Sequence, residues 1–226
     1  NWAVRADAGR FRAFTYETTA DGALLEDVAS QQKSFVAVLM AIAADKGLLD
    51  VAGPVSDYVA PGWSKAGESR ERAIRILDLL TMTSGLDETL AYVAPAGSVF
   101  LYNTPAYAVT KRVLSAAAKQ PLEEITRTWL TAPLRMTNTG WRKRPGAFGD
   151  VGNPTGLVTS PRDVAALGQL VLDRGRAADG RRVVSEAGLQ AMLAPTIANP
   201  AYGRLWWLNG SGYTIRPPAN RTEGPL

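Results

Sequence analysis

Ser30 and Lys33 stand three residues apart at the head of a long apolar run, SQQKSFVAVLMAIAADKG, which covers residues 30–47. Side chains three residues apart share one face of a helix, so a helix that begins at or just before Ser30 would bring the lysine amine beside the serine hydroxyl. The helix dipole and apolar burial would both favour a neutral lysine, which can accept the serine proton. The bare motif is equally typical of an N-cap serine followed by a solvated lysine, so other residues must decide.

The absence of histidine and cysteine narrows the chemistry of the chain. Without histidine, a Ser-His-Asp triad, a His-ligated zinc ion and an imidazole base are impossible. Without cysteine, thiol catalysis and disulfides are impossible as well. Any general base must be a lysine, a tyrosine or a carboxylate, and a Ser-Lys pair is the plausible way left to activate a nucleophile.

Tyr102 is the second candidate for chemistry. It lies in SVFLYNTPAYAV, residues 98–109, just before a predicted helix and within a loop bounded by glycine and proline. A phenol in such a loop could point into a cleft. A core aromatic side chain would explain the same residue, and the pattern alone favours that second interpretation.

Composition indicates a soluble globular protein of 226 residues, 46% of them hydrophobic and 20% charged. This size predicts one domain, or one domain with two lobes. The net charge of +4 comes from arginines scattered between Arg5 and Arg221, and the basic run 142–144 is typical of a solvated turn, so nucleic acid is not an expected partner. No apolar run approaches the ~20 residues that span a bilayer. We expect neither a membrane span nor a cofactor, and the residues leave the oligomeric state open.

The elements that must position these residues follow from periodicity and turn signals. An extended segment from Phe11, a turn at Asp21-Gly22 and a second extended segment to Asp27 precede the apolar helix, which should stop at Lys46-Gly47. Helix spacing and capping residues predict further helices or helical turns at 55–58, 72–82, 105–118, 122–130, from Ser160 as N-cap onward, and 185–193. The aromatic stretch 202–209 predicts a late strand. This order predicts an α+β fold with a helical lobe inserted into a sheet-bearing lobe.

Several segments of the sequence resemble those of the serine β-lactamase and penicillin-binding-protein superfamily and occur in the same order along the chain. They are closest to its class C-like branch of β-lactamase-related hydrolases. Beside SQQK and FLYNTPAY, they are GLLDVAGPVSDYV (47–59), LLTMTSGL (79–86), PLRMTNTGW (133–141), GNPTGLVTSPRDVAALG (152–168) and YGRLWWLN (202–209). Agreement over most of the chain is far more specific than a Ser-x-x-Lys motif alone. It favours an active-site role for Ser30 and Lys33.

The resemblance implies a role for each matching residue. Ser30 would be the acylated nucleophile, Lys33 its proton-accepting partner and Tyr102 the tyrosine that shuttles protons, while the backbone N–H of Ser30 would supply half of an oxyanion hole. The second motif of the family is commonly Tyr-x-Asn, whose amide holds the acylamino group of a β-lactam. Here Asn103 comes one place early and Thr104 stands in the amide's place, and both are expected to contact substrate. This departure favours an ester or peptide substrate over a β-lactam.

The implied fold is an antiparallel sheet flanked by helices, next to a helical lobe. We expect residues 1–226 to form one incomplete β-lactamase-like domain, with a sheet-bearing lobe at about 1–46 and 165–226 and a helical lobe at about 47–164. No Lys-Thr-Gly or His-Thr-Gly segment is present, so the third motif and the C-terminal strands that carry it are expected to be missing.

The implied activity is hydrolysis of a small or peptide-like acyl substrate through an acyl-enzyme. A carboxylesterase, a D-amino-acid peptidase or amidase and a weak β-lactamase all fit this description. The alternative is a non-hydrolytic penicillin-binding or penicillin-sensing relative that is acylated without turnover. Relatives that act on cell-wall material are exported, which is what the resemblance implies about location.

Overall fold

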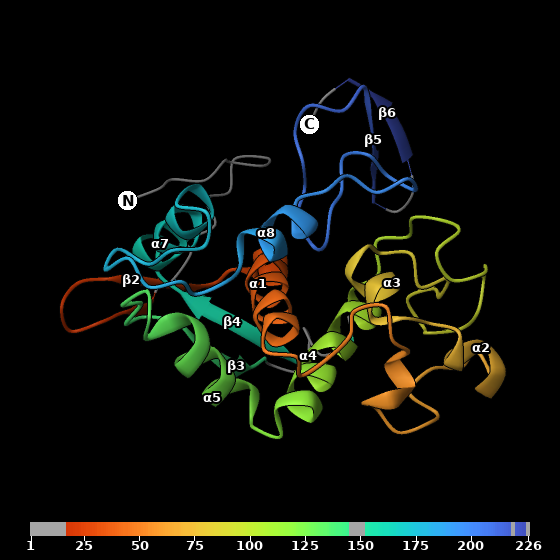
Figure 1. Cartoon of the computed structure of the whole chain (residues 1–226), viewed down its shortest axis with the longest axis horizontal. Coiled ribbons are helices and arrows are strands. Elements are labelled where there is room, and N and C mark those ends of the chain that lie inside the picture. The colour runs from red at the N-terminus through yellow and green to blue at the C-terminus, as the bar shows by residue number, and fades with distance from the viewer. Residues whose placement is uncertain (1–16, 145–151, 218–219, 225–226) are drawn as a thin grey trace, which may run out of the picture.

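A four-stranded antiparallel sheet forms one side of the structure, which is a computed structural model describing residues 17–144, 152–217 and 220–224. The strand order is β1-β2-β4-β3. The strands are β1 (Glu17–Thr18), β2 (Leu24–Asp27), β3 (Gly140–Lys143) and β4 (Thr155–Thr159). Figure 1 shows the sheet beside the central helix α1, with α5 and α7 on the same side of the molecule and α2 and α3 on the other. The expected antiparallel sheet flanked by helices is confirmed.

The first two strands form the hairpin that the Asp21-Gly22 signal predicts. Gly22 takes a φ of +83°, which glycine adopts without strain, and β1 pairs with β2. The part of the predicted strand that begins at Phe11 lies outside the described residues. Strand β2 then pairs with β4 through Asp27 and Val158, and the N–H of Val28 donates to Leu157 O at 3.0 Å. The sheet therefore fixes the chain immediately before Ser30.

Helix α1 (Gln32–Asp45) follows a single 3-10 turn at Ala29–Gln31. It is buried over most of its surface because all of its side chains from Phe35 to Ala43 are apolar. It ends at Lys46 and Gly47, where Gly47 takes a φ of +67°. The predicted helix and its Lys-Gly end are confirmed, and Figure 1 shows α1 at the centre of the molecule.

The remaining helices are mostly those that the sequence predicts. They are the 3-10 turn Val55–Asp57, α2 (Glu68–Arg72), α3 (Ile76–Leu80), α4 (Thr104–Ala118), α5 (Leu122–Thr126) continued by a π-helical turn Arg127–Thr131, α7 (Pro161–Leu172) and α8 (Glu186–Met192). Asn103, Ser160 and Ser185 cap α4, α7 and α8 by accepting a backbone N–H three residues on.

The predicted helix 72–82 is wrong as a single element. It is interrupted between α2 and α3, where Arg75 is extended and pairs with Pro54. The carboxylate of Asp78 accepts the N–H of Arg75 at 2.9 Å and its guanidinium at 2.8 Å. Pairing with a distant segment and a new helix start together prevent one continuous helix.

The predicted strand 202–209 is also wrong. The segment is a tight loop with a single antiparallel bridge between Tyr202 and Trp207. Leu205 turns the chain with a φ of +60°, and its N–H donates to Leu80 O at 2.8 Å. The strands that follow, β5 (Tyr213–Arg216) and β6 (Asn220–Glu223), form a separate hairpin.

The lobe boundaries also need correction. Strands β3 and β4 fall within the expected helical lobe 47–164, yet they pair with each other and with β2 in the sheet. One hydrophobic core, with α1 at its centre, continues through both parts. Over residues 17–144, 152–217 and 220–224, no helix combines the length and apolarity needed to cross a bilayer.

Candidate active site

Ser30 and Lys33 form a direct pair at the start of α1. Lys33 Nζ donates to Ser30 Oγ at 3.2 Å and to Thr104 Oγ1 at 3.4 Å. Ser30 is exposed, whereas Lys33 is only 3% exposed. The serine therefore faces solvent while the amine beside it is buried, as the three-residue spacing predicts.

Burial changes the acidity of Lys33. Desolvation lowers the pKa of its ammonium to about 8, and the positive charge of Arg144 contributes further in the same direction. The rings of Tyr102 and Tyr107 lie 4.8 Å and 4.7 Å from Nζ, so the cation retains favourable contacts when it is charged. With this pKa, about a tenth of the amine is neutral at pH 7 and able to accept a proton.

Tyr102 is the third member of the group. It lines the same pocket as Ser30, and burial raises the pKa of its phenol above the usual value of 10, while the nearby Ser30 side chain acts in the opposite direction. Tyr102 is therefore protonated near neutral pH and can donate a proton.

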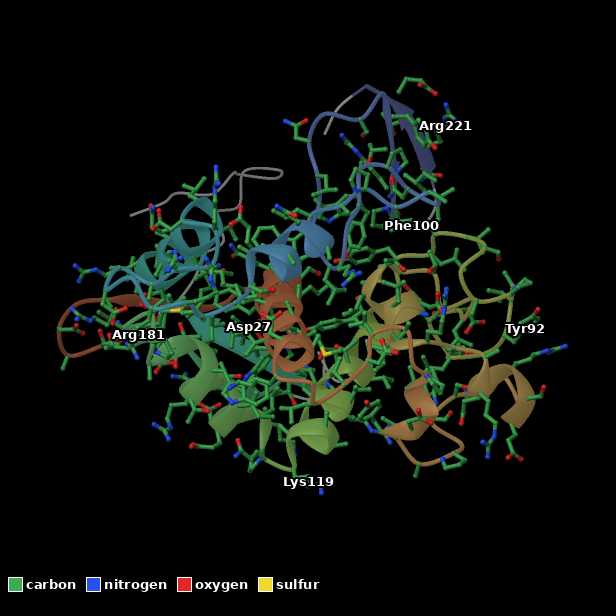
Figure 2. The ribbon with its side chains drawn as sticks, in the orientation of Figure 1. Asp27, Tyr92, Phe100, Lys119, Arg181 and Arg221 are labelled. Carbon is green, nitrogen blue, oxygen red and sulfur yellow. The ribbon has the colours of Figure 1, made fainter. Side chains whose placement is uncertain are left out.

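Ser30 opens onto a pocket of about 300 Å³ with an aromatic wall. Trp207 stacks on Tyr102 with ring centroids 6.0 Å apart, and Tyr202 meets Trp207 edge-on at 4.8 Å. Phe100 packs behind Tyr202 at 5.2 Å. In Figure 2, Asp27 and Phe100 lie on either side of α1. The complete lining is Ser30, Gln31, Lys33, Ser34, Tyr102, Tyr202, Leu205, Trp206 and Trp207.

The two expected substrate-contacting residues occupy different places. Thr104 lies beside Lys33, as the hydrogen bond above shows. Asn103 is 1% exposed, and its amide accepts the N–H of Ala106 and donates to Leu86 O and Asp87 O, each at 2.8 Å. The structure therefore brings Ser30, Lys33, Tyr102 and Thr104 together, whereas the Asn103 side chain joins α4 to the preceding loop.

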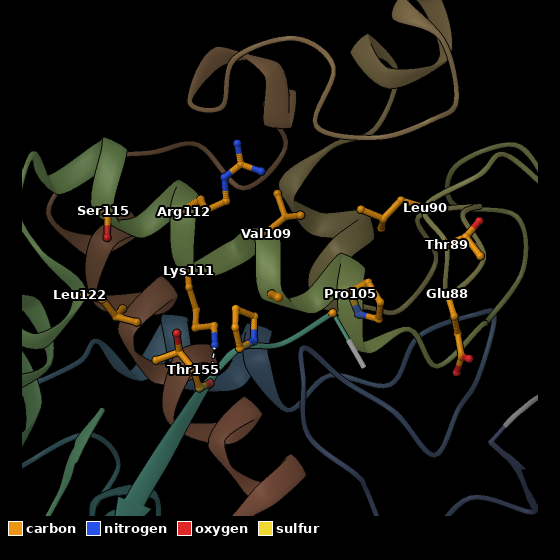
Figure 3. Close-up of a pocket in the computed structure, with 13 residues that line it drawn as sticks. Glu88, Thr89, Leu90, Pro105, Val109, Lys111, Arg112, Ser115, Leu122 and Thr155 are labelled. Carbon is orange, nitrogen blue, oxygen red and sulfur yellow. Dashed lines mark hydrogen bonds between the residues drawn. The ribbon is translucent and has the colours of Figure 1, made fainter. Parts of the chain in front are cut away.

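Behind the pocket lies a buried polar network that the sequence reasoning missed. Gln32 Oε1 accepts from Tyr107 Oη at 3.1 Å, from Asn153 Nδ2 at 3.3 Å and from Lys111 Nζ at 3.4 Å. Lys111 Nζ also donates to Thr155 O at 2.9 Å (Figure 3). One signal in the sequence could have revealed this network. Lys111 follows Tyr107 by four residues and therefore lies on the same buried face of the predicted helix 105–118.

Lys111 is a second lysine with altered acidity. Burial is the main cause that lowers the pKa of its ammonium to about 7; the charges of Arg144 and Lys33 act in the same direction, and Asp27 acts in the opposite one. Lys111 also lines a hollow of about 670 Å³ on another side of α4, shown in Figure 3, which includes neither Ser30 nor Tyr102. That larger hollow is therefore separate from the Ser-Lys pair.

The described part of the chain offers no evident metal site. Within those ranges, no three acidic side chains lie close enough together to hold a metal ion. The chemistry available at the pocket is that of a hydroxyl, an amine and a phenol.

The sequence itself identifies the family. A sequence model of the Beta-lactamase family matches residues 5–221, nearly the whole of the 226-residue chain. The chain therefore belongs to the Beta-lactamase family. No curated protein sequence matches it.

Solved structures show the same fold. A candidate β-lactamase from Bacteroides dorei DSM 17855 is 20% identical, with a TM-score of 0.71 over 87% of this chain and 68% of that one. A D-stereospecific amidohydrolase from Streptomyces sp. is 15% identical, with a TM-score of 0.68 over 90% and 75%. A hydrolase with promiscuous acyltransferase activity is 18% identical, with a TM-score of 0.63 over 80% and 68%. This confirms a β-lactamase/transpeptidase-like fold.

Proposed function

We propose that the protein is a serine hydrolase that forms an acyl-enzyme on Ser30 and hydrolyses an ester or an amide. The observation that carries this proposal is the 3.2 Å hydrogen bond between Lys33 Nζ and Ser30 Oγ at the mouth of a pocket. A serine hydroxyl is a weak nucleophile until a base takes its proton. A buried lysine with a pKa of about 8 can act as that base.

In the acylation step, Ser30 Oγ attacks the substrate carbonyl carbon and its proton passes to neutral Lys33. The backbone N–H of Ser30 can bind the resulting oxyanion, since no acceptor for it occurs among the described residues. Collapse breaks the bond to the leaving oxygen or nitrogen, which takes a proton from Tyr102. The Lys33 ammonium then returns a proton to Tyr102, so both groups regain their starting states.

In the deacylation step, water attacks the acyl carbon and gives its proton to Lys33. The bond between that carbon and Ser30 Oγ breaks, and the oxygen recovers a proton from the lysine. The products are a free carboxylic acid and the original enzyme, so the cycle needs no cofactor or metal ion.

The pocket wall supports an uncharged acyl group as substrate. Tyr202, Leu205, Trp206 and Trp207 provide rings and an aliphatic side chain, and Lys33 is the one cationic residue in the lining as described. The Asn103 amide is bonded within the fold rather than turned to the pocket. Esters and amides of uncharged acyl groups therefore fit better than β-lactams, whose acylamino group would lack its amide partner.

Labelling with a fluorophosphonate, followed by peptide mapping, tests the nucleophile. We expect one adduct, on Ser30, and we expect Ser30→Ala to abolish it and to lower hydrolysis of short acyl esters by about a thousandfold or more. Ser69→Ala, which changes an exposed serine of α2, is the matched control. An adduct on another residue, or full esterase activity in Ser30→Ala, would contradict the proposal.

A fluorescent penicillin separates hydrolysis from the penicillin-binding alternative. An adduct on Ser30 that disappears within minutes supports turnover. A permanent adduct, together with no activity on esters or amides, supports a binding or sensing role instead.

A further inference from the structure

Ala29, the residue before the nucleophile, has an unusual backbone conformation. Its φ of +47° lies in the left-handed region, which is disfavoured for alanine because its Cβ crowds the following carbonyl oxygen. Glycine would occupy this region freely, but the chain has alanine here. Some other interaction must therefore hold the backbone at this point.

Two side chains hold the two polar backbone groups of Ala29. Asp27 Oδ1 accepts the N–H of Ala29 at 2.9 Å, and Gln32 Nε2 donates to Ala29 O at 2.8 Å. We call Asp27 and Gln32 the Ala29 clamp. One member lies at the end of β2 and the other in the first turn of α1.

Each member of the clamp is itself fixed by further contacts. Arg144 donates to both carboxylate oxygens of Asp27, at 2.7 Å each. The three donors to Gln32 Oε1, from Tyr107, Lys111 and Asn153, determine which end of the amide is the oxygen. The amide NH₂ is therefore directed to Ala29 and cannot exchange places with the oxygen without losing these bonds.

We propose that Asp27 and Gln32 are positioning residues, which hold Ala29 in its left-handed conformation and thereby aim Ser30 Oγ at Lys33. Without the clamp, Ala29 relaxes toward negative φ, which redirects the peptide that follows it and moves both the Ser30 N–H and its hydroxyl. The buried network of Lys111 and Asn153 serves to orient Gln32. This inference rests on the proposed function of Ser30.

A double-mutant cycle between Ala29 and Gln32 tests the clamp. Gln32→Glu retains an oxygen that can accept from Lys111 but loses the side-chain donor to Ala29 O, while the backbone N–H of residue 32, which also donates to Ala29 O, is kept. We expect it to slow fluorophosphonate labelling of Ser30 about tenfold, which is the size expected for one positioning hydrogen bond. On the Ala29→Gly background, where glycine adopts positive φ without support, we expect the same change to slow labelling by about twofold or less.

The cycle separates positioning from general stabilisation. A purely structural role for Gln32 predicts the same slowing on both backgrounds, and that result would overturn the clamp. Gln169→Glu, at an exposed position on α7, controls for the added negative charge. The full pH dependence of labelling is recorded for each variant, so that a change in Lys33 acidity is distinguished from misplacement of Ser30.

Melting temperatures of the same four proteins give a second cycle that needs no reaction at Ser30. Ala29→Gly should raise the Tm of Gln32→Glu by about 2–4 °C more than it raises that of the original protein. An unlabelled Ser30 in the original protein would refute the proposed function, while the Tm cycle would still decide whether the clamp holds Ala29. Additive Tm changes would overturn the clamp even if Ser30 is labelled.

Discussion

Lys33 is buried between two tyrosine rings, and its acidity sets how the reaction rate should depend on pH. The neutral amine is the base, and it predominates above the lysine pKa of about 8. We therefore expect kcat/KM for an ester to rise as pH increases through about 8. A guanidinium does not lose its proton in this range, so the rise should disappear in Lys33→Arg, with activity about a hundredfold lower.

The pH profile of that variant decides the role of the lysine. The chain has no histidine that could titrate in this range. A profile that stays unchanged in Lys33→Arg would therefore remove Lys33 from the mechanism.

Arg144 offers a finer test of the same residue. Burial is the main cause of the lowered pKa of Lys33, and the charge of Arg144 is the second. Arg144→Gln should therefore move the rise in kcat/KM to higher pH by a fraction of a unit, because less repulsion opposes protonation of Lys33. Arg142→Gln, which changes an exposed arginine paired with Glu17, is the matched control and should leave the midpoint in place.

At the scale of elements, the sequence predicts a helix or strand correctly where neighbouring residues alone determine its start and end. Ser160 caps α7 as predicted, and Ser185, the first residue of the predicted helix 185–193, caps α8. The single helix predicted over 72–82 and the strand predicted over 202–209 fail because distant contacts decide them. Arg75 pairs with Pro54, and Leu205 donates to Leu80 while its own φ is positive.

The contribution of Asn103 to the stability of helix α4 can be tested by mutation. Its amide caps α4 and donates to two loop carbonyls, so we expect Asn103→Ala to reduce the free energy of unfolding in urea by about 1–3 kcal/mol. Asn138→Ala, at a side chain that bonds only its neighbour Thr137, is the control among the described asparagines. A large rise in KM with unchanged stability would instead support the expected contact between Asn103 and substrate.

At the scale of the whole molecule, the site joins segments that are far apart in the chain. The contact between Ser30 and Lys33 could be predicted from the sequence because the two residues lie within one helical turn. The loop position made Tyr102 a candidate, but only the family resemblance favoured an active-site role over a core aromatic, and the aromatic wall lies in the segment 202–209 that was predicted as a strand. The contact between Asp27 and Arg144 spans 117 residues, and no local pattern encodes it.

Lys111 links the network to the stability of the whole fold. Its folded pKa of about 7 lies below the 10.5 of an unperturbed lysine, so between these values the folded state binds fewer protons than the unfolded state. The free energy of unfolding should therefore rise with pH over this window. In Lys111→Met this contribution is absent.

Urea unfolding at about pH 6.5, 8 and 9.5 measures this linkage. The stability of the original protein relative to Lys111→Met should increase steadily across the series. Lys143→Met, at an exposed lysine of β3, should show a constant difference. A constant difference for Lys111→Met as well would mean that Lys111 keeps its proton throughout.

The stacked pair of Tyr102 and Trp207 has one more consequence. Trp207 is 37% exposed and lies almost parallel to Tyr102, at an interplanar angle of 18°, on the wall of the pocket that Ser30 enters. An acyl group attached to Ser30 would displace water from this indole, and indole emission shifts to shorter wavelength in a less polar environment. Together with Trp206 in the same lining, Trp207 would therefore make the tryptophan emission of the protein follow occupancy of the site in real time, without any added label.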